Sequence, residues 1–471
     1  MLKHFLLTFS LIVGGGGFVS TNAQTHTRIS LPSLFSDHIV LQQQDSVPVW
    51  GWGEAGTTVC AVGSWASQDT ISAVVDDAGR WSLKLKTEVY GGPYTLHFFQ
   101  AGFEEEGITL VDVMLGEVWL CSGQSNMEFS PANGIVNQAE EIGAANYSNL
   151  RFFSIEKRGS QSLQDDCKAT WECCSPDVMQ RRSAVAYFFG RHLYENLKIP
   201  IGLIVSAWGG SAAEVWIPKS SLPKMVDFPR IQQERKCPWW PVEPGTLYNS
   251  MIHPLLPYRI AGTIWYQGES NRDDPQSYFN LMKTLITSWR KGFQQDFPFY
   301  LVQIAPFNYQ SKNNGPALIR EAQAEIARQI PYTGLVVTND VGDFNNIHPA
   351  RKQEVGIRLA NLALGDKYGR KEIPFESPCF EAMEIQKAKI RIRFSQPIVC
   401  KEKVINGFQI ADEKGHFVQA HARIIGDDVI EVWAKAIKHP MAVRYCFDDA
   451  TVGNLQGTNS LPVEPFRTDK K

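Results

Sequence analysis

The chain has 471 residues, too many for a single hydrophobic core, so we expect two or three domains. Hydrophobic residues make up 44% of the sequence and charged residues 20%, as in ordinary globular proteins. The formal net charge is only −3 and basic residues do not cluster, which argues against a nucleic-acid or anionic-membrane partner.

Residues 1–23 are predicted to be a secretory signal peptide. Lys3 precedes an apolar stretch from Phe5 to Val13, and small residues precede Ala23. This stretch is shorter than the ~20 apolar residues of a membrane-spanning helix, and no later run reaches that length. We therefore expect export to the periplasm or the extracellular space, without membrane insertion.

Residues 24–112 show short alternating runs separated by turn residues. Val47–Gly53 is one such run, and Asp76–Trp81 contains a turn signal before the next. Short strands without helical periodicity predict an N-terminal β-sandwich module.

Residues 113–368 alternate between apolar strands and amphipathic helices. Helical spacing is found over 183–197, 278–289, 317–330 and 350–364, and buried strands are expected at 199–205, 299–304 and 334–338. This alternation predicts a parallel sheet with helices on both faces, whose functional groups gather at the carboxyl ends of the strands. A proline-rich insertion is expected around 214–248, where Trp239 and Trp240 are candidates for lining a sugar cleft.

After Tyr368 the sequence returns to strand-like alternation, so residues 369–471 are predicted to form a C-terminal β module. Nine cysteines are scattered without CxxC pairs, and no nucleotide-binding or metalloprotease motif is present. We expect neither a metal ion nor a cofactor. Spacing alone predicts no disulfide pairing and no oligomeric state.

A glycine-flanked serine follows the apolar run Val111–Leu120. The segment Cys121–Phe129 reads CSGQSNMEF, with Ser125 just past the expected strand. A serine between a strand and a helix can be a nucleophile at the mouth of a parallel sheet. It can equally be a turn or helix-capping serine, because the spacing is not that of the GxSxG motif.

Four segments decide between these alternatives. GEVWLCSGQSNMEF resembles the first block of the sialate O-acetylesterase family, carbohydrate esterases related to the SGNH hydrolases. Trp208–Ser211, Ile264–Asn271 and Ile347–Pro349 resemble later blocks of that family, in its order. The resemblance implies an α/β fold, with an SGNH-like three-layer α/β/α catalytic domain flanked by β-sandwich modules.

The resemblance also implies a serine esterase mechanism. Ser125 is the expected nucleophile, and His348, in a loop after the strand at 334–338, is the expected general base. The acid that orients His348 has three candidates. Many SGNH enzymes carry Asp three residues before this histidine, but Asn345 occupies that position here.

Glu269 is the favoured candidate for the orienting acid, because it lies in the QGES block and follows a strand. Asp343 and Asp340, on the loop of His348, are the alternatives. The expected donors to the oxyanion or substrate are Ser125 N–H, Gly210 N–H and the amide of Asn271 or Gln267. The structural alternatives are a tight turn at the glycine and a strand-end cap at Asn271.

The expected function is that of an exported serine esterase that removes O-acetyl groups from sialic acids through an acetyl-enzyme. Its partner is then an acetylated sugar or glycan. One alternative is an acetylesterase of xylan or another acetylated polysaccharide. The other is a non-catalytic glycan-binding protein, which would suit the β modules and the 13 tryptophans.

Overall fold

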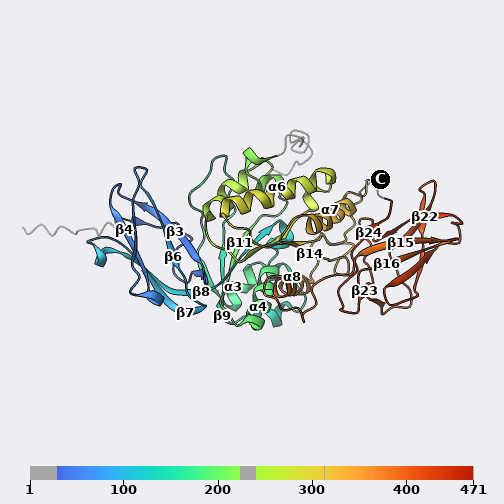
Figure 1. The fold of residues 1–471 in the computed structure, drawn as a ribbon, viewed down its shortest axis with the longest axis horizontal. Coiled ribbons are helices and arrows are strands. Elements are labelled where there is room, and N and C mark those ends of the chain that lie inside the picture. Colours follow the sequence, from blue (N-terminus) through green and yellow to red (C-terminus); the bar gives the residue numbers. More distant parts are fainter. Residues whose placement is uncertain (1–28, 223–239, 312, 470–471) are drawn as a thin grey trace, which may run out of the picture.

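The structure is a computed structural model that describes residues 29–222, 240–311 and 313–469. The predicted signal peptide, and the part of the predicted insertion that contains Trp239, lie outside the described residues. Figure 1 shows three parts side by side along the long axis, with a helix-containing domain between two β modules. This arrangement confirms the predicted α/β domain and its two β modules.

The N-terminal module consists of two packed β-layers. One is the three-stranded sheet β1-β3-β6, and the other continues into the central domain. Trp81, Leu83 and Leu85 alternate with exposed residues along β6, as expected for a sheet with one buried face. The strands are β1 (Ile29–Ser30), β2 (Val40–Gln42), β3 (Ser46–Gly53), β4 (Thr58–Gly63), β5 (Ile71–Val74), β6 (Arg80–Lys86) and β7 (Gly91–Gln100).

The strand β8 (Ile108–Gly123) is shared by the first two parts of the chain. Its first half pairs with β7 and β2, and its second half pairs with β11 and β12 of the central sheet. The predicted boundary at residue 112 therefore falls inside a strand. Asp112 lies where the strand bends, with φ of 54°.

The central sheet has the order β10-β9-β11-β8-β12-β13-β14, and every neighbouring pair except β10 and β9 is parallel. The residues of β11 and β12 are buried without exception, as expected for strands that are covered on both faces. The strands are β9 (Tyr147–Ser154), β10 (Trp171–Cys174), β11 (Ile201–Ala207), β12 (Gly262–Tyr266), β13 (Phe299–Val302) and β14 (Thr333–Val336).

Helices cover both faces of this sheet. The apolar sides of α4 and α8 share one core with residues of β8 and β12, and those of α6 and α7 share another. Figure 1 shows α6 and α7 above the sheet and α4 and α8 below it. The helices are α1 (Ser125–Glu128), α2 (Gln138–Gly143), α3 (Pro176–Arg181), α4 (Ala184–Leu197), α6 (Pro275–Phe293), α7 (Gly315–Gln329) and α8 (Lys352–Asp366).

The C-terminal module has its own core between the sheets β15-β16-β21-β20 and β19-β18-β22-β24. It contacts the central domain through polar groups, such as Arg467 with Glu321. The strands are β15 (Phe380–Gln386), β16 (Lys389–Phe394), β17 (Ile398–Cys400), β18 (Phe408–Asp412), β19 (Phe417–Gln419), β20 (His421–Ile424), β21 (Val429–Trp433), β22 (Pro440–Tyr445), β23 (Leu455–Gly457) and β24 (Phe466–Arg467).

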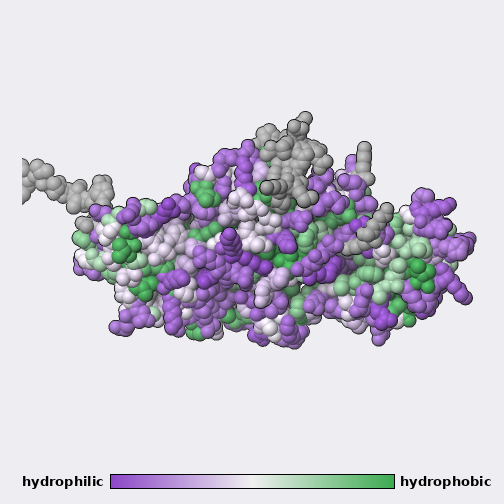
Figure 2. All heavy atoms as spheres, turned by 45° about the horizontal axis from the view of Figure 1, so that its top comes forward, coloured by the Kyte–Doolittle hydropathy of each residue, from purple (hydrophilic) through white to green (hydrophobic). Residues whose placement is uncertain are grey.

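The visible surface is mainly hydrophilic, with hydrophobic side chains in small separate patches (Figure 2). None of the helices in the described part of the chain combines the length and the apolar character needed to cross a membrane. The eight cysteines among the described residues are all free thiols.

Candidate active site

The strand β8 brings Ser125 to the carboxyl edge of the central sheet. At Gly123, the last residue of the strand, φ is 138° and a Cβ atom would lie 2.2 Å from the Tyr266 carbonyl oxygen. Glycine therefore allows β8 to run close to β12 before the chain turns into α1. Ser125 is half-buried and follows the strand at which the sheet order switches direction, where α/β proteins bind their ligands.

His348 meets Ser125 from the loop between β14 and α8. Its Nε2 atom lies 2.8 Å from Oγ of Ser125, although the two residues are 223 positions apart. The Phe129 ring stacks on the imidazole, with centroids 5.6 Å apart and planes inclined by 27°. Asn346 Oδ1 accepts a hydrogen bond from the His348 backbone N–H at 2.9 Å, which holds the loop.

The surroundings of His348 favour a neutral imidazole. Burial lowers the pKa of His348 and the positive charge of Lys352 lowers it further, against the opposing charge of Glu128. A neutral ring whose Nε2 carries no proton can accept the proton of the Ser125 hydroxyl group. The geometry and the charge state therefore suit a nucleophile beside its general base.

None of the predicted orienting acids hydrogen-bonds to His348. Glu269 is buried and its Oε1 atom accepts a hydrogen bond from Asn126 Nδ2 at 2.7 Å. Asp343 is exposed and accepts from the backbone of Asn345, while Asp340 forms an ion pair with Arg358 at 2.6 Å. In the described ranges, no carboxylate oxygen lies within hydrogen-bonding distance of His348 Nδ1.

A buried group that we call the Asn126 cluster lies next to the Ser–His pair. It consists of Asn126, Glu269 and Lys352. The Asn126 amide donates to Glu269 and, at 3.1 Å, to the carbonyl oxygen of Ile347, and it accepts a hydrogen bond from Lys352 Nζ at 2.5 Å. The cluster connects the residue after Ser125 to the residue before His348.

Both charged members of the Asn126 cluster are perturbed by burial. Burial lowers the pKa of Lys352 to about 7, against the attraction of Glu269. Burial raises the pKa of Glu269, and the Asn126 hydrogen bond and the charges of Lys352 and Arg272 oppose that rise. The second carboxylate oxygen of Glu269 has no hydrogen-bond partner among the described residues. Perturbed, desolvated groups of this kind concentrate at functional sites.

The turn that contains Gly209 and Gly210 lies against Ser125. A Cβ atom on Gly209 would be 3.2 Å from Cβ of Ser125, and its N–H donates to Glu128 Oε2 at 2.7 Å. Gly210 has φ of 74°, and a Cβ atom there would overlap the Trp240 indole ring. In the described ranges, the N–H groups of Ser125 and Gly210 have no protein acceptor. Both are therefore available as donors to a substrate oxygen.

Asn271 and Gln267 belong to a different buried group, which we call the Asn271 cluster. It consists of Gln267, Asn271 and Glu214. Asn271 Oδ1 accepts from Gln267 Nε2 at 2.7 Å and from the Ala213 N–H at 3.0 Å, while Asn271 Nδ2 donates to Glu214 at 2.8 Å. Gln267 Nε2 also donates to the Ser211 carbonyl at 3.2 Å. The two side chains predicted to donate to the substrate therefore hydrogen-bond to the 211–214 loop in the structure.

Comparison with known proteins identifies the family. A family model described as carbohydrate esterase, sialic acid-specific acetylesterase matches residues 115–365. Sialate O-acetylesterase from Homo sapiens is 32% identical over 419 residues, covering 80% of this chain and 79% of the relative. The chain belongs to the sialate O-acetylesterase family. It is accordingly a carboxylic ester hydrolase.

Two further similarities extend across the chain. Sialate O-acetylesterase from Mus musculus is 31% identical over 415 residues, covering 75% of this chain and 76% of the relative. The crystal structure of a carbohydrate acetylesterase from Xanthomonas citri matches with a TM-score of 0.85 at 32% identity, covering 94% of this chain and 100% of that one. This neighbour includes the β modules as well as the central domain.

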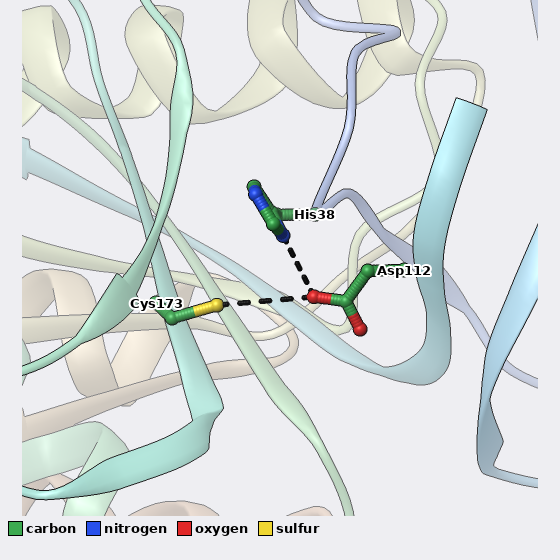
Figure 3. A group of neighbouring side chains, drawn as sticks. All are labelled: His38, Asp112 and Cys173. Atoms are coloured by element: carbon green, nitrogen blue, oxygen red, sulfur yellow. Dashed lines mark hydrogen bonds and ion pairs between the residues drawn. The ribbon is translucent and has the colours of Figure 1, made fainter.

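A second group of titratable side chains in this esterase lies where the N-terminal module meets the central sheet. Figure 3 shows His38 and Cys173 converging on one carboxylate oxygen of Asp112. His38 Nδ1 is 2.7 Å from that oxygen and Cys173 Sγ is 4.0 Å away. However, the buried Arg151 guanidinium lies 2.8 Å from the other oxygen. Because Arg151 already neutralises Asp112, we interpret the contacts of His38, Asp112 and Cys173 as part of the interface between the N-terminal module and the central domain, not as a cation site.

Sequence reasoning missed Asn126 and Lys352. Lys352 lies on the same helical face as the buried residues Val355, Gly356 and Leu359, which are three, four and seven positions further on. A lysine in an apolar stripe was therefore a detectable signal. Asn126 carried no such signal apart from its place beside Ser125.

Proposed function

We propose that this esterase removes O-acetyl groups from sialic acids by a serine mechanism with an acetyl-enzyme intermediate. The observation that carries the proposal is the 2.8 Å contact between Ser125 Oγ and His348 Nε2 at the carboxyl edge of the sheet. The names of the human and mouse relatives support sialic acid as the sugar. The contact also argues against a non-catalytic glycan-binding protein, which needs no such pair.

Acylation begins with the attack of Ser125 Oγ on the acetyl carbonyl carbon. The hydroxyl proton moves to Nε2 of His348 as the new C–O bond forms. The negative charge on the carbonyl oxygen is stabilised by the N–H groups of Ser125 and Gly210. When the tetrahedral intermediate collapses, the bond to the sugar oxygen breaks and that oxygen takes the proton from His348.

Deacylation repeats these steps with water. His348, neutral again, removes a proton from a water molecule whose oxygen attacks the acetyl-enzyme carbonyl. The Ser125 ester bond breaks, the serine oxygen regains the proton, and acetate leaves. Because the environment lowers the pKa of His348, the base remains available in mildly acidic solution.

The proposal extends to the fold type and the location of the protein. The strand-end serine, the parallel sheet and the helices on both faces suit an SGNH-like domain. The residues at 1–23 suit export to the periplasm or the extracellular space. Mass spectrometry of the exported protein should find Gln24 as the first residue. Retention of residues 1–23 would contradict export by this signal.

A second candidate substrate is an acetylated polysaccharide such as xylan. The Xanthomonas citri neighbour is described more broadly as a carbohydrate acetylesterase. A cleft of about 330 Å³ also adjoins the Gly210 turn, with Trp208, Trp240, Gln161 and Glu243 among its lining residues. Two indole rings beside polar groups suit the apolar faces and hydroxyl groups of a sugar chain.

Parallel assays separate the two substrates. Acetate release is measured from O-acetylated sialic acid and from acetylated xylo-oligosaccharides, and kcat/KM is compared. The proposal expects the larger value for sialic acid, and a larger value for xylo-oligosaccharides would favour the second candidate. Rapid quenching followed by mass spectrometry should find one acetyl group on the peptide that contains Ser125. Acetylation elsewhere would contradict the mechanism.

A further inference from the structure

The position of Lys352 is unfavourable for a charged side chain. It is 1% exposed, and it is the first residue of α8, where the helix dipole disfavours a positive charge. A buried ammonium group lowers stability unless it is well partnered, and an apolar side chain would fill the same space at less cost. This cost points to a role that an apolar residue could not perform.

The partners of Lys352 are neutral groups close to the reacting pair. Its Nζ atom hydrogen-bonds to Asn126 Oδ1 at 2.5 Å and lies 4.7 Å from the ring centroid of Phe129 and 5.8 Å from that of Tyr266. Phe129 is also the ring that stacks on His348. The ammonium group and the imidazole thus share one aromatic neighbour.

The ammonium group selects one orientation of the Asn126 amide. Lys352 can only donate, so it requires the amide oxygen, whereas Glu269 and the Ile347 carbonyl can only accept from the amide nitrogen while Glu269 is ionised. In the flipped orientation the amide NH2 group would face the Lys352 ammonium group, and the amide oxygen would face the oxygens of Glu269 and Ile347. The selected orientation ties α1, which begins with Ser125, to the backbone beside His348.

The charge of Lys352 also acts on His348. Glu128, from α1, acts on His348, and Glu269 acts on Lys352. Around Glu269 lie Arg272 and the phenols of Tyr266 and Tyr309. Among them, Glu128 favours the imidazolium ion, and Lys352 disfavours it. Lys352 is protonated below neutral pH, which is the range in which the imidazole would otherwise gain its proton.

We propose that Lys352 is a positioning residue for ester hydrolysis, which orients the Asn126 amide between the nucleophile and the base and holds its charge against the Phe129 ring that stacks on His348. The proposal rests on the Ser125–His348 mechanism proposed above. In this proposal Glu269 accepts from the nitrogen of the Asn126 amide, which also donates to the Ile347 carbonyl, so Glu269 influences His348 only through these two residues.

The test compares Lys352→Met with Lys352→Arg, using turnover of 4-nitrophenyl acetate across a range of pH. Lys352→Met keeps the volume and removes the charge. It should lower kcat roughly 100-fold with little change in KM, because a small misplacement near the chemistry costs about that much. It should also move the acid limb of the kcat/KM profile to higher pH. Lys352→Arg should restore part of kcat and return the limb toward that of the parent.

Arg351→Met is the matched control, since it removes a positive charge one residue away. Arg351 is exposed and pairs with Glu354, so solvent screens its charge. We expect parental kcat and an unmoved acid limb. A Lys352→Met protein with parental kcat and a parental limb would overturn the proposal, as would an equal shift in Arg351→Met.

Glu269→Gln keeps the proposal testable if Lys352→Met does not fold. It retains the shape of the side chain but removes the negative charge that favours protonated Lys352, so Lys352 should lose its proton at lower pH and the acid limb should move to higher pH. A limb that stays in place or moves to lower pH would contradict the proposed charge relation. Ser125→Ala separates this result from the proposed function. An active Ser125→Ala enzyme would refute the serine mechanism, whereas an inactive one together with a parental Lys352→Met refutes only the role of Lys352.

Discussion

The Asn126 cluster and the Asn271 cluster lie at the same sheet edge, and each includes a residue of the 269–271 turn. They nevertheless contact different parts of the site. Glu269 and Asn271 are two residues apart, but Glu269 contacts Asn126 and Asn271 contacts Glu214. The Asn126 cluster includes a buried cation and reaches the backbone beside His348. The Asn271 cluster reaches the backbone of the loop that follows Gly210.

The comparison teaches that burial and polarity alone do not identify the residues that act on the reaction. Both clusters are buried, and both contain a carboxylate and an amide. Of the two, only the Asn126 cluster combines a charge that acts on His348 with a hydrogen bond between the residue after Ser125 and the backbone before His348. We therefore expect it to control kcat and pH dependence, and the Asn271 cluster to control mainly the stability of the loop.

The largest effect is expected for Ser125→Ala, and the losses in kcat of the other variants are compared with it. Loss of the nucleophile should lower kcat on 4-nitrophenyl acetate roughly 10⁴-fold or more, as for other serine hydrolases. The melting temperature should stay close to that of the parent, because Ser125 is half-buried and, among the described residues, its hydroxyl group hydrogen-bonds to His348 alone. Turnover within tenfold of the parent would mean that another group attacks the ester.

Asn126→Ala should have the next largest effect. It removes the amide that connects the segment of Ser125 to the segment of His348, so we expect a loss in kcat of roughly 100-fold. It also leaves Lys352 and Glu269 buried without that partner, which should lower the free energy of unfolding by about 1–3 kcal/mol. Steady-state kinetics and urea denaturation measure the two effects. Parental kcat together with reduced stability would place the Asn126 cluster in the same class as the Asn271 cluster.

Asn271→Ala should sharpen the difference between the clusters. It leaves Gln267 and Glu214 without their shared partner, so the free energy of unfolding should fall by about 1–3 kcal/mol, much as for Asn126→Ala. The loss in kcat should be smaller, and the acid limb of the pH profile should stay in place. A shifted acid limb would show that the Asn271 cluster also acts on His348.

Asp343→Asn is expected to have the smallest effect. Asp343 is exposed and its carboxylate accepts a hydrogen bond within its own loop, so stability should change by no more than about 0.5 kcal/mol. Because it does not contact His348 in the structure, kcat should also stay near the parental value. A large fall in kcat would identify Asp343 as the acid that orients His348 during turnover.

Much of the central domain could be predicted from periodicity. The helix expected over 183–197 is α4 (Ala184–Leu197), with Ser183 as its N-cap, and the strand expected at 299–304 is β13 (Phe299–Val302). Long periodic segments carry this signal because one face must be buried. The strand expected to end at Leu120 continues to Gly123, since the close pairing of β8 with β12 depends on a neighbour 143 residues away in the Gly123–Tyr266 register.

The site residues could be predicted where the sequence resembles blocks of the family. They could not be predicted where their contacts depend on residues far away in the chain. The resemblance placed Ser125 and His348 together, and the structure gives their distance. Sequence alone does not reveal that nearby residues of one turn contact different clusters: Glu269 hydrogen-bonds to Asn126, and Asn271 hydrogen-bonds to Glu214. The pairing of Asn126 with Lys352 joins positions 226 apart and arises only from tertiary packing.

The continuity of β8 has a consequence for how this enzyme can be divided. The same sixteen-residue strand closes the N-terminal sheet and ends two residues before Ser125. A cut between the two parts would therefore break the hydrogen bonds of a strand that both share. A protein trimmed to start at Val113 would lose the β7 and β2 partners of that strand and expose an apolar edge. The N-terminal module is thus part of the scaffold of the active site and cannot be exchanged as an independent appendage.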